Sequence, residues 1–166
     1  MINKVLIAVV LMATPCAADY VNAESGLCVR AEPTTESEIL DILPFGTEVD
    51  GGEGEWIPFE GGYIASEWIC EDNPMEYIGT WLTTAYGATG SPCANGQYPE
   101  VGVTIAHNTL PMGTKLYIED VGVRIVEDRG PTWLGSEWCD IYLGETGACI
   151  QYGEQMHKVY LVKERE

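Results

Sequence analysis

Basic residues are scarce in this sequence. Lys and Arg number 8 against 26 Asp and Glu, which gives a formal net charge of −18 over 166 residues. Between Asp19 and Thr114 the only Lys or Arg is Arg30. Such a surface repels phosphate backbones and anionic lipid headgroups. The composition argues against nucleic acid as a partner and favours a ligand that is neutral or carries few charges, although acidity also keeps an exported protein soluble.

Long hydrophobic runs are almost absent. One occurs near the start, where Lys4 precedes an apolar stretch at residues 5–13. Small residues end this segment, and residues 1–18 together have the pattern of a secretory signal peptide, too short to be a stable membrane span. We expect a periplasmic or secreted protein with no membrane insertion after signal cleavage. Lipid attachment at Cys16 is the alternative, but Pro15 stands where a small residue is expected.

Histidine is limited to 2 residues, and no spacing of Cys and His resembles a zinc site, so neither a metal nor another cofactor is expected. Cysteine is better represented. Export to an oxidising compartment favours disulfides. The number of cysteines after the signal peptide is odd, so one thiol either stays unpaired or forms a disulfide between two chains. These cysteines are Cys28, Cys70, Cys93, Cys139 and Cys149.

The strongest pattern lies in residues 104–143. Two apolar runs rich in Ile and Val flank a turn, and the second run ends at Asp128, directly before Arg-Gly-Pro. Asp140 opens a further apolar strand, and His107 ends the strand that precedes the two runs. One imidazole and two carboxylates therefore lie at strand ends, where a rigid sheet can present catalytic groups.

This region resembles the rare lipoprotein A family of peptidoglycan-cleaving enzymes, which has a double-psi β-barrel. The resemblance rests on Ala-His-Asn-Thr-Leu-Pro-Met-Gly-Thr at residues 106–114, Asp-Arg-Gly-Pro at 128–131 and Asp140. Ala-Asn-Gly-Gln at 94–97 is similar to a turn of the same family, with Gln in place of an acid. The order of the motifs is more specific than any one of them.

A second, overlapping resemblance is to the three-aspartate domain of membrane-bound lytic transglycosylase A relatives. Thr-Ala-Tyr at residues 84–86, Glu-Asp at 127–128 and Asp-Ile-Tyr at 140–142 carry it, together with Tyr-Gly at 152–153 before the last apolar strand. Both families imply the same barrel and the same chemistry. The three-aspartate pattern has Asp where Asn108 stands here.

Short strands and turns are predicted for residues 19–72. Leu-x-Val-Arg-x-x-Pro at 27–33, Gly-Thr at 46–47 and a Gly-aromatic close at 62–64 resemble a bacterial SH3 domain. We therefore expect an all-β protein with a signal peptide at 1–18, a small SH3-like barrel at 19–72, a linker at 73–78 and a six-stranded double-psi β-barrel at 79–166.

The SH3 resemblance implies binding to cell-wall glycan or peptide. Trp56, Tyr63 and Trp68 are candidate contacts, although the same rings suit the core of so small a barrel. It also implies that the first and last strands lie close together, which leads us to expect a Cys28–Cys70 disulfide. Such a bridge contributes roughly 3 to 4 kcal/mol in the chain-entropy model. The pairing of the remaining cysteines stays open.

The family resemblance implies a lytic transglycosylase, in which a hydroxyl of muramic acid is the nucleophile and one carboxyl group acts first as acid and then as base. That group must be protonated at the working pH, so its pKa should be raised by an apolar setting or a neighbouring carboxylate. Asp140 is the expected acid and base. Asp128 is its expected partner, although Asp in this position also makes simple turns. His107 is expected to bind substrate or to orient a carboxylate.

The peptidoglycan glycan strand is the expected partner, and five residues are expected to contact it. The long loop at 87–102 has the length of a functional loop, but it also suits a surface excursion held by Cys93. A thiol nucleophile at Cys139 is disfavoured because neighbouring residues on a strand point to opposite faces. A glycoside hydrolase and a non-catalytic, expansin-like wall-binding protein are the alternatives on this barrel. The expected substrate contacts are Tyr86, Tyr98, Asn108, Arg129 and Trp133.

Overall fold

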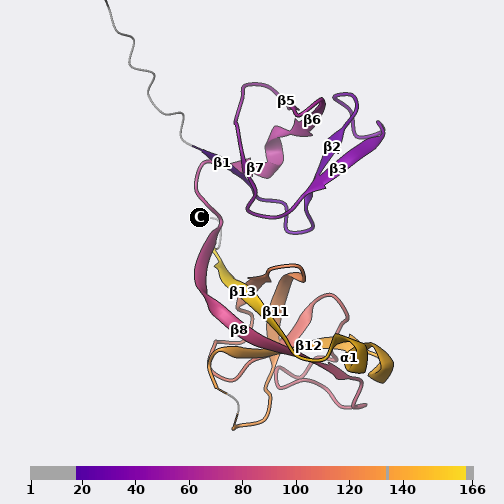
Figure 1. Ribbon diagram of the computed structural model, residues 1–166, viewed down its shortest axis with the longest axis vertical. Helices are drawn as coiled ribbons and strands as arrows, with labels where there is room; N and C mark the ends of the chain where they lie inside the picture. Colours follow the sequence, from indigo (N-terminus) through magenta and orange to yellow (C-terminus); the bar gives the residue numbers. More distant parts are fainter. Residues whose placement is uncertain (1–17, 134, 164–166) are drawn as a thin grey trace, which may run out of the picture.

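The computed structural model describes residues 18–133 and 135–163, which form two lobes (Figure 1). Apart from a short 3-10 helix in the first lobe and one short α-helix in the second, the regular elements of this part of the chain are strands, so the all-β prediction is confirmed. The predicted signal peptide lies outside the described residues except for its last residue, Ala18, and Cys16 is not described.

The N-terminal lobe consists of two small sheets, of three strands in the order β4-β1-β7 and of four in the order β3-β2-β6-β5. Alternation drives their packing: in β2, Leu27 and Val29 are buried while the residues between and after them are more exposed. The elements are β1 (Asp19–Val21), β2 (Leu27–Arg30), β3 (Ile39–Leu43), β4 (Glu48–Val49), β5 (Trp56–Phe59), β6 (Gly62–Ala65), η1 (Ser66–Trp68) and β7 (Ile69–Cys70).

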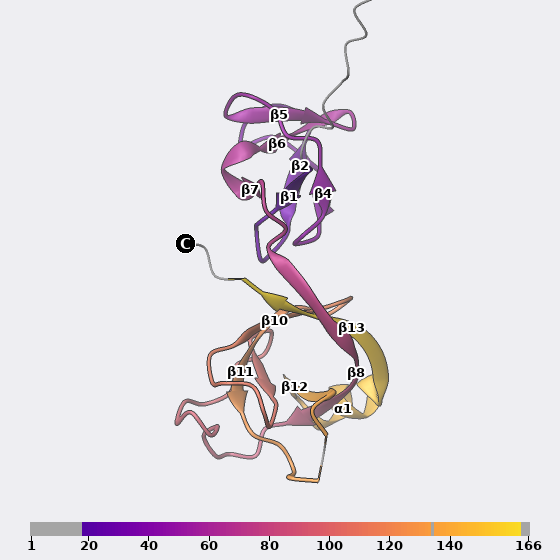
Figure 2. The same cartoon turned by 90° about the vertical axis from the view of Figure 1, so that its left-hand side faces the viewer.

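The second lobe is a closed barrel with the strand order β10-β11-β9-β12-β8-β13. Two of its pairings are parallel, β9 with β11 and β8 with β12, and the others are antiparallel. β8 runs from the first lobe into the barrel (Figure 2). The elements are β8 (Met75–Gly87), β9 (Thr104–Ala106), β10 (Lys115–Ile118), β11 (Gly122–Asp128), β12 (Trp138–Gly144), α1 (Thr146–Tyr152) and β13 (Gln155–Val162).

The barrel interior is filled by apolar side chains that alternate along the strands. Cys139 and Ile141 of β12 point inward, as do Leu116 and Ile118 of β10. Removing such side chains from water supplies about 1.5 to 3 kcal/mol for each large one. None of the helices in the described segments is long and apolar enough to cross a membrane. The buried cluster comprises Trp81, Ile105, Leu116, Ile118, Val126, Cys139, Ile141 and Val159.

The lobes touch through an aromatic contact and an ion pair. Phe45 of the first lobe is 3% exposed, and its ring centroid lies 6.0 Å from that of Tyr117 on β10. Lys115 Nζ lies 2.5 Å from Glu24 Oε1. Because both charged side chains are substantially exposed, this pair adds little stability, and the buried Phe45 carries more of the contact.

Two expectations about the first lobe are not met. The segment 73–78, expected as a linker, is largely strand, because β8 already begins at Met75 and pairs there with Val162. The Cys28–Cys70 disulfide is not formed: Cys28 has a free thiol on β2, whereas β7 with Cys70 belongs to the other sheet. The assumption that the first and last strands are adjacent was correct for β1 and β7, but Cys28 lies one strand later.

Candidate active site

Four residues form one row across four neighbouring strands of the barrel. Asp140 of β12 pairs with Thr84 of β8 on one side and with Ala106 of β9 on the other. Asp128, at the end of β11, also pairs with Ala106. The two aspartates therefore flank a single alanine, and two strand spacings put their Cα atoms roughly 10 Å apart. The structure brings together the two carboxylates that the sequence motifs selected.

The row lies on the outer face of the barrel. Cys139 and Ile141 belong to the barrel core, so Asp140 between them points the other way. Ile105 likewise points inward, which places Ala106 on the same outer face as Asp140. Ala106 is 3% exposed, and its methyl group adds little bulk between the two carboxyl groups. Asp140 and Ala106 therefore share the outer face, and Asp128 pairs beside Ala106 after a β-bulge in β11.

Asp140 is held by a chain of two hydrogen bonds. Trp138 Nε1 donates to Thr84 Oγ1 at 3.1 Å, and Thr84 Oγ1 donates to Asp140 Oδ1 at 2.7 Å. Because an indole nitrogen can only donate, it fixes the direction of the Thr84 hydroxyl proton. Among the described residues no group donates to Asp140 Oδ2 at hydrogen-bond distance. That oxygen is the one left to carry a proton or to meet a ligand.

The pKa of Asp140 is raised above its usual range. Burial is the main cause, the hydrogen bond from Thr84 opposes it, and the negative charge of Asp128 adds to it. A raised pKa keeps a larger fraction of this carboxyl group protonated near neutral pH than an exposed aspartate would have. This is the property required of a general acid.

Asp128 is fixed by backbone and side-chain donors. Its Oδ1 accepts from the N–H groups of Ala94 at 3.0 Å and Arg129 at 2.8 Å, and its Oδ2 accepts from Tyr86 Oη at 3.4 Å. The bond to Arg129 is the local turn contact that the sequence allowed as an alternative. The bond to Ala94 fastens the loop of residues 88–103 beside the row.

Tyr86, an expected substrate contact, lies next to Asp128. Burial raises the pKa of its hydroxyl, and Asp128 and Cys93 raise it further, so it remains a neutral donor. Its ring lies 5.2 Å from that of Tyr142, centroid to centroid. Cys93 is 6% exposed, and burial together with the charge of Asp128 raises the pKa of its thiol.

His107 does not occupy the position expected of it. It is 0% exposed, its Nδ1 donates to the carbonyl oxygen of Trp138 at 2.7 Å, and its Nε2 accepts from Thr109 Oγ1 at 3.0 Å. Its ring stacks on Trp81 at 4.9 Å. With both nitrogens engaged, the imidazole cannot orient either carboxylate, and burial lowers its pKa. Its position supports a structural role that anchors the start of β12.

Asn108 and Arg129 brace the turn after Asp128. Asn108 Nδ2 donates to the Pro131 carbonyl oxygen and its Oδ1 accepts from Gly130 N–H, both at 2.9 Å. The guanidinium of Arg129 donates to the His107 carbonyl oxygen. Both atoms of the Asn108 amide are thus used within the protein, which leaves Arg129, an exposed residue, as the more accessible of these two expected substrate contacts.

Trp133 and Tyr98 are not part of the row. Both are on loops and strongly exposed, at 79% and 71%. Tyr98 follows the turn at Gln97, whose carbonyl oxygen accepts from Cys93 N–H at 2.7 Å. Their accessibility suits ring stacking on a ligand, but the structure does not bring them into contact with either aspartate.

Cysteine chemistry does not explain the site. Cys93, Cys139 and Cys149 have free thiols, and no bridge joins them. Cys139 is 0% exposed within the barrel core, and burial, with a further contribution from Asp140, raises the pKa of its thiol to about 12. A thiol nucleophile at Cys139 is therefore excluded. In the described segments no group of three or more His, Cys, Asp and Glu residues is arranged to hold a metal ion.

Three residues of the site escaped the sequence reasoning. Thr84 belongs to the Thr-Ala-Tyr motif but was not expected to contact Asp140, and no role was expected for Trp138. Gly130 lies against the Trp138 ring so closely that an added Cβ would fall 2.3 Å from its Cη2 atom. Gly130 could have been predicted from the sequence, because it follows Asp-Arg in the Asp-Arg-Gly-Pro motif. Comparison with protein-family models and with curated proteins gave no match.

Proposed function

We propose that this chain is an exported lytic transglycosylase that cleaves the glycan strands of peptidoglycan. The observation that supports this most is the pairing of Asp128 and Asp140 with the same residue, Ala106, together with the raised pKa of Asp140. The proposal includes a double-psi topology for the closed six-stranded barrel, supported by its two parallel strand pairs, and an SH3-like, wall-binding N-terminal lobe.

In this proposal Asp140 acts twice. Protonated on Oδ2, it donates its proton to the glycosidic oxygen as the bond to the muramic acid C1 breaks. The resulting carboxylate then takes the proton of the C6 hydroxyl of the same sugar, whose oxygen bonds to C1 and closes a 1,6-anhydro ring. The acid is regenerated and no water is consumed, so a single carboxyl group suffices.

The neighbours of Asp140 have distinct tasks. Thr84 holds Oδ1, which leaves Oδ2 as the reacting oxygen. Asp128 adds to the effect of burial on the pKa of Asp140 and faces the ligand from the other side of Ala106. Tyr86 and the exposed rings of Tyr98 and Trp133 are the proposed stacking surfaces for the glycan.

The test is mass spectrometry of the soluble products that purified peptidoglycan releases on incubation with residues 19–166. We expect products with 1,6-anhydro ends from the wild type, and a loss of at least about 100-fold in the Asp140→Asn variant. Asp120→Asn is a matched control, since Asp120 lies in the turn between β10 and β11, where its φ of 63° suits asparagine equally well.

Other products would assign a different function to the same barrel. Products with reducing ends would indicate a glycoside hydrolase that uses both carboxylates. Binding to the insoluble wall without any release, unchanged in Asp140→Asn, would indicate a non-catalytic wall-binding protein. Either result would overturn the transglycosylase proposal.

A further inference from the structure

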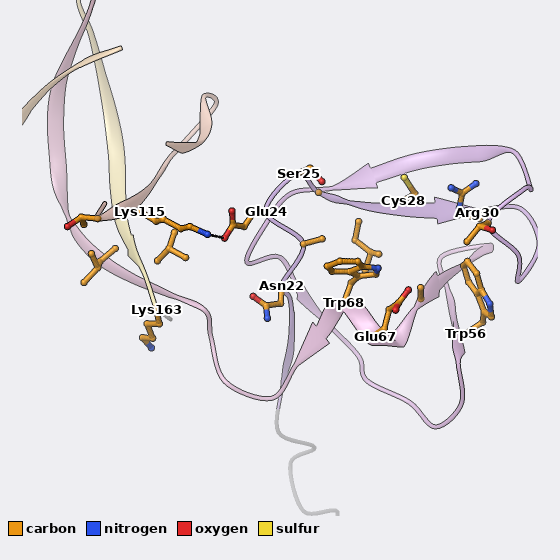
Figure 3. A pocket seen from close by; sticks show the side chains of 18 of the residues that line it. Asn22, Glu24, Ser25, Cys28, Arg30, Trp56, Glu67, Trp68, Lys115 and Lys163 are labelled. Carbon is orange, nitrogen blue, oxygen red and sulfur yellow. Dashed lines mark hydrogen bonds and ion pairs between the residues drawn. The ribbon is translucent and has the colours of Figure 1, made fainter. Parts of the chain in front are cut away.

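A second candidate site lies between the lobes, away from the carboxylate row. A cavity of about 1040 Å³ is lined on one side by the N-terminal lobe, including Trp56, Glu67 and Trp68, and on the other by the start of β10 and the end of β13 (Figure 3). This volume lies at the upper end of the range of roughly 300 to 1,000 Å³ that is usual for small-molecule pockets.

The cavity is remote from Asp140. Its barrel wall includes Leu161 and Val162, which pair with the first residues of β8, whereas Asp140 pairs with Thr84 near the other end of that strand. The eight residue steps from Glu76 to Thr84 span roughly 26 Å of strand. A ligand in the cavity therefore does not occupy the proposed catalytic site.

Two indoles and a carboxylate line the lobe side of this cavity. Trp56 pairs with Ala65, and Ser66 N–H donates to the Glu55 carbonyl oxygen at 3.0 Å, so the turn that carries Glu67 is fixed beside Trp56. Asn22 N–H donates to the Trp68 carbonyl oxygen at 2.8 Å, which fixes the far end of the same turn. Figure 3 shows the Glu67 side chain between the two indoles.

Three basic residues line the cavity, and each already has a hydrogen-bond acceptor within the protein, although only for Lys115 is that acceptor a carboxylate. Lys115 pairs with Glu24, Arg30 Nη1 donates to the Ser37 carbonyl oxygen at 2.7 Å, and Lys163 Nζ donates to the Asn73 carbonyl oxygen at 3.0 Å. Among the described residues none forms an ion pair with Glu67. Trp68, directly after it, is 46% exposed. An exposed indole beside an uncompensated carboxylate is a suitable environment for a positively charged group.

We propose that this cavity binds an alkylammonium group of a peptide, with Glu67 as counter-ion and the faces of Trp56 and Trp68 as cation–π partners. Aromatic rings attract an ammonium within about 6 Å of the ring centroid. The lobe around the site is strongly acidic, since Arg30 is its only basic residue, and its field attracts cations. A neutral sugar would use the indoles but would have no use for the charge of Glu67.

The test uses the full chain and two soluble probes, Nα-acetyl-lysine methylamide and its Nε-acetylated counterpart. Binding is measured by calorimetry, and the site is located through the indole N–H resonances of Trp56 and Trp68. We expect the Nε-acetylated probe to bind about tenfold more weakly, because acetylation removes the charge. We expect Glu67→Gln to weaken binding of the amine by a similar factor.

The control is Glu53→Gln, which makes the same charge change at another exposed position of the same lobe. Equal binding of both probes, an unaffected Glu67→Gln variant, undisturbed Trp56 and Trp68 resonances, or no binding at all would each overturn the inference. Because Glu67 is exposed, the Glu67→Gln variant should remain folded, and a weaker binding of the amine can be assigned to the lost charge.

A second measurement distinguishes amines of wall peptides from amines of soluble peptides. The chain is pelleted with peptidoglycan before and after the free amines of the peptidoglycan are N-acetylated. A loss of pelleting on acetylation assigns the site to wall peptides. Unchanged pelleting, with the soluble probe still bound, assigns it to soluble peptides. The Asp140→Asn variant should bind the probe as the wild type does. The test of this cavity is therefore independent of the test of the proposed catalysis.

Discussion

Asp128 and Asp140 are register partners of the same residue, Ala106, from opposite sides of β9. The pKa of Asp140 is raised chiefly by burial, and the negative charge of Asp128 raises it further. Removing the charge of Asp128 should therefore lower the pKa of Asp140, and removing the hydrogen bond from Thr84 should raise it.

Replacing Asp128 by asparagine should lower the pKa of Asp140. Since a general acid must be protonated, the alkaline limb of the plot of kcat/KM against pH should move to lower pH in Asp128→Asn. The position of the limb is informative even if the maximal rate falls. Measurement of product release across pH values tests it, with Asp120→Asn as control. A limb that stays in place would show that the two carboxyl groups are not coupled.

Replacing Thr84 by valine should act in the opposite direction. The Thr84 hydroxyl stabilises the ionised form of Asp140, so Thr84→Val should raise the pKa of Asp140 and move the alkaline limb to higher pH. The variant also leaves the Trp138 indole N–H without its acceptor, at a cost to stability of about 1 to 3 kcal/mol. Thr84→Ser keeps the hydroxyl and should retain both properties, which separates the hydrogen bond from changes in packing.

Asp140→Asn should increase stability at neutral pH while it removes activity. The pKa of Asp140 is raised in the folded state above its ordinary value of 3.8, so ionisation of this group disfavours folding. This destabilisation is absent below pH 3.8 and develops as the pH rises through the folded-state pKa. Chemical denaturation at low and neutral pH measures it. Wild type and variant should converge at low pH, and an equal difference at both pH values would contradict this explanation.

His107 should prove structural rather than catalytic. His107→Ala removes two buried hydrogen bonds and the ring stacked on Trp81, so the free energy of unfolding should fall by roughly 3 kcal/mol. Because His107 contacts neither carboxylate, the limbs of the rate profile should stay in place for the folded fraction. A shift in either limb would restore the role that the sequence motif suggested.

The same histidine predicts a pH dependence of stability. Burial is the main cause of its lowered pKa, the bond to the Trp138 carbonyl oxygen opposes it, and Arg129 adds to it. A base whose folded-state pKa lies below its unfolded value of 6.5 contributes stability above pH 6.5, and this contribution is lost as the pH falls through the window below it. Denaturation of wild type and His107→Ala between neutral and mildly acidic pH should show the loss in the wild type alone.

The sequence indicated the all-β class, because alternation depends on local chemistry, and the family resemblance implied that Asp128 and Asp140 act together. It could not show that His107 turns inward, since a residue at a strand end can face either side. Nor could it identify the bond from Thr84 to Asp140, which joins residues 56 apart and depends on the parallel register of β8 and β12. The Cys28–Cys70 prediction was wrong for a similar reason: adjacency of strands does not specify which residues face each other.

Gly130 connects the turn after Asp128 to the geometry of Asp140. A methyl group at Gly130 would lie 2.3 Å from Trp138 Cη2, so Gly130→Ala must displace the indole, and Trp138 Nε1 in turn orients Thr84. We expect overpacking to lower stability by about 1 to 3 kcal/mol and the rate to fall more than the loss of folded protein explains. Unfolding by denaturant and the rate of product release, each corrected for folded fraction, measure the two effects. Gly135→Ala is the matched control, because nothing lies within 4 Å of a Cβ at Gly135. A loss of activity in Gly130→Ala that Thr84→Val does not share would show that the contacts through Trp138 and Thr84 are not what positions Asp140.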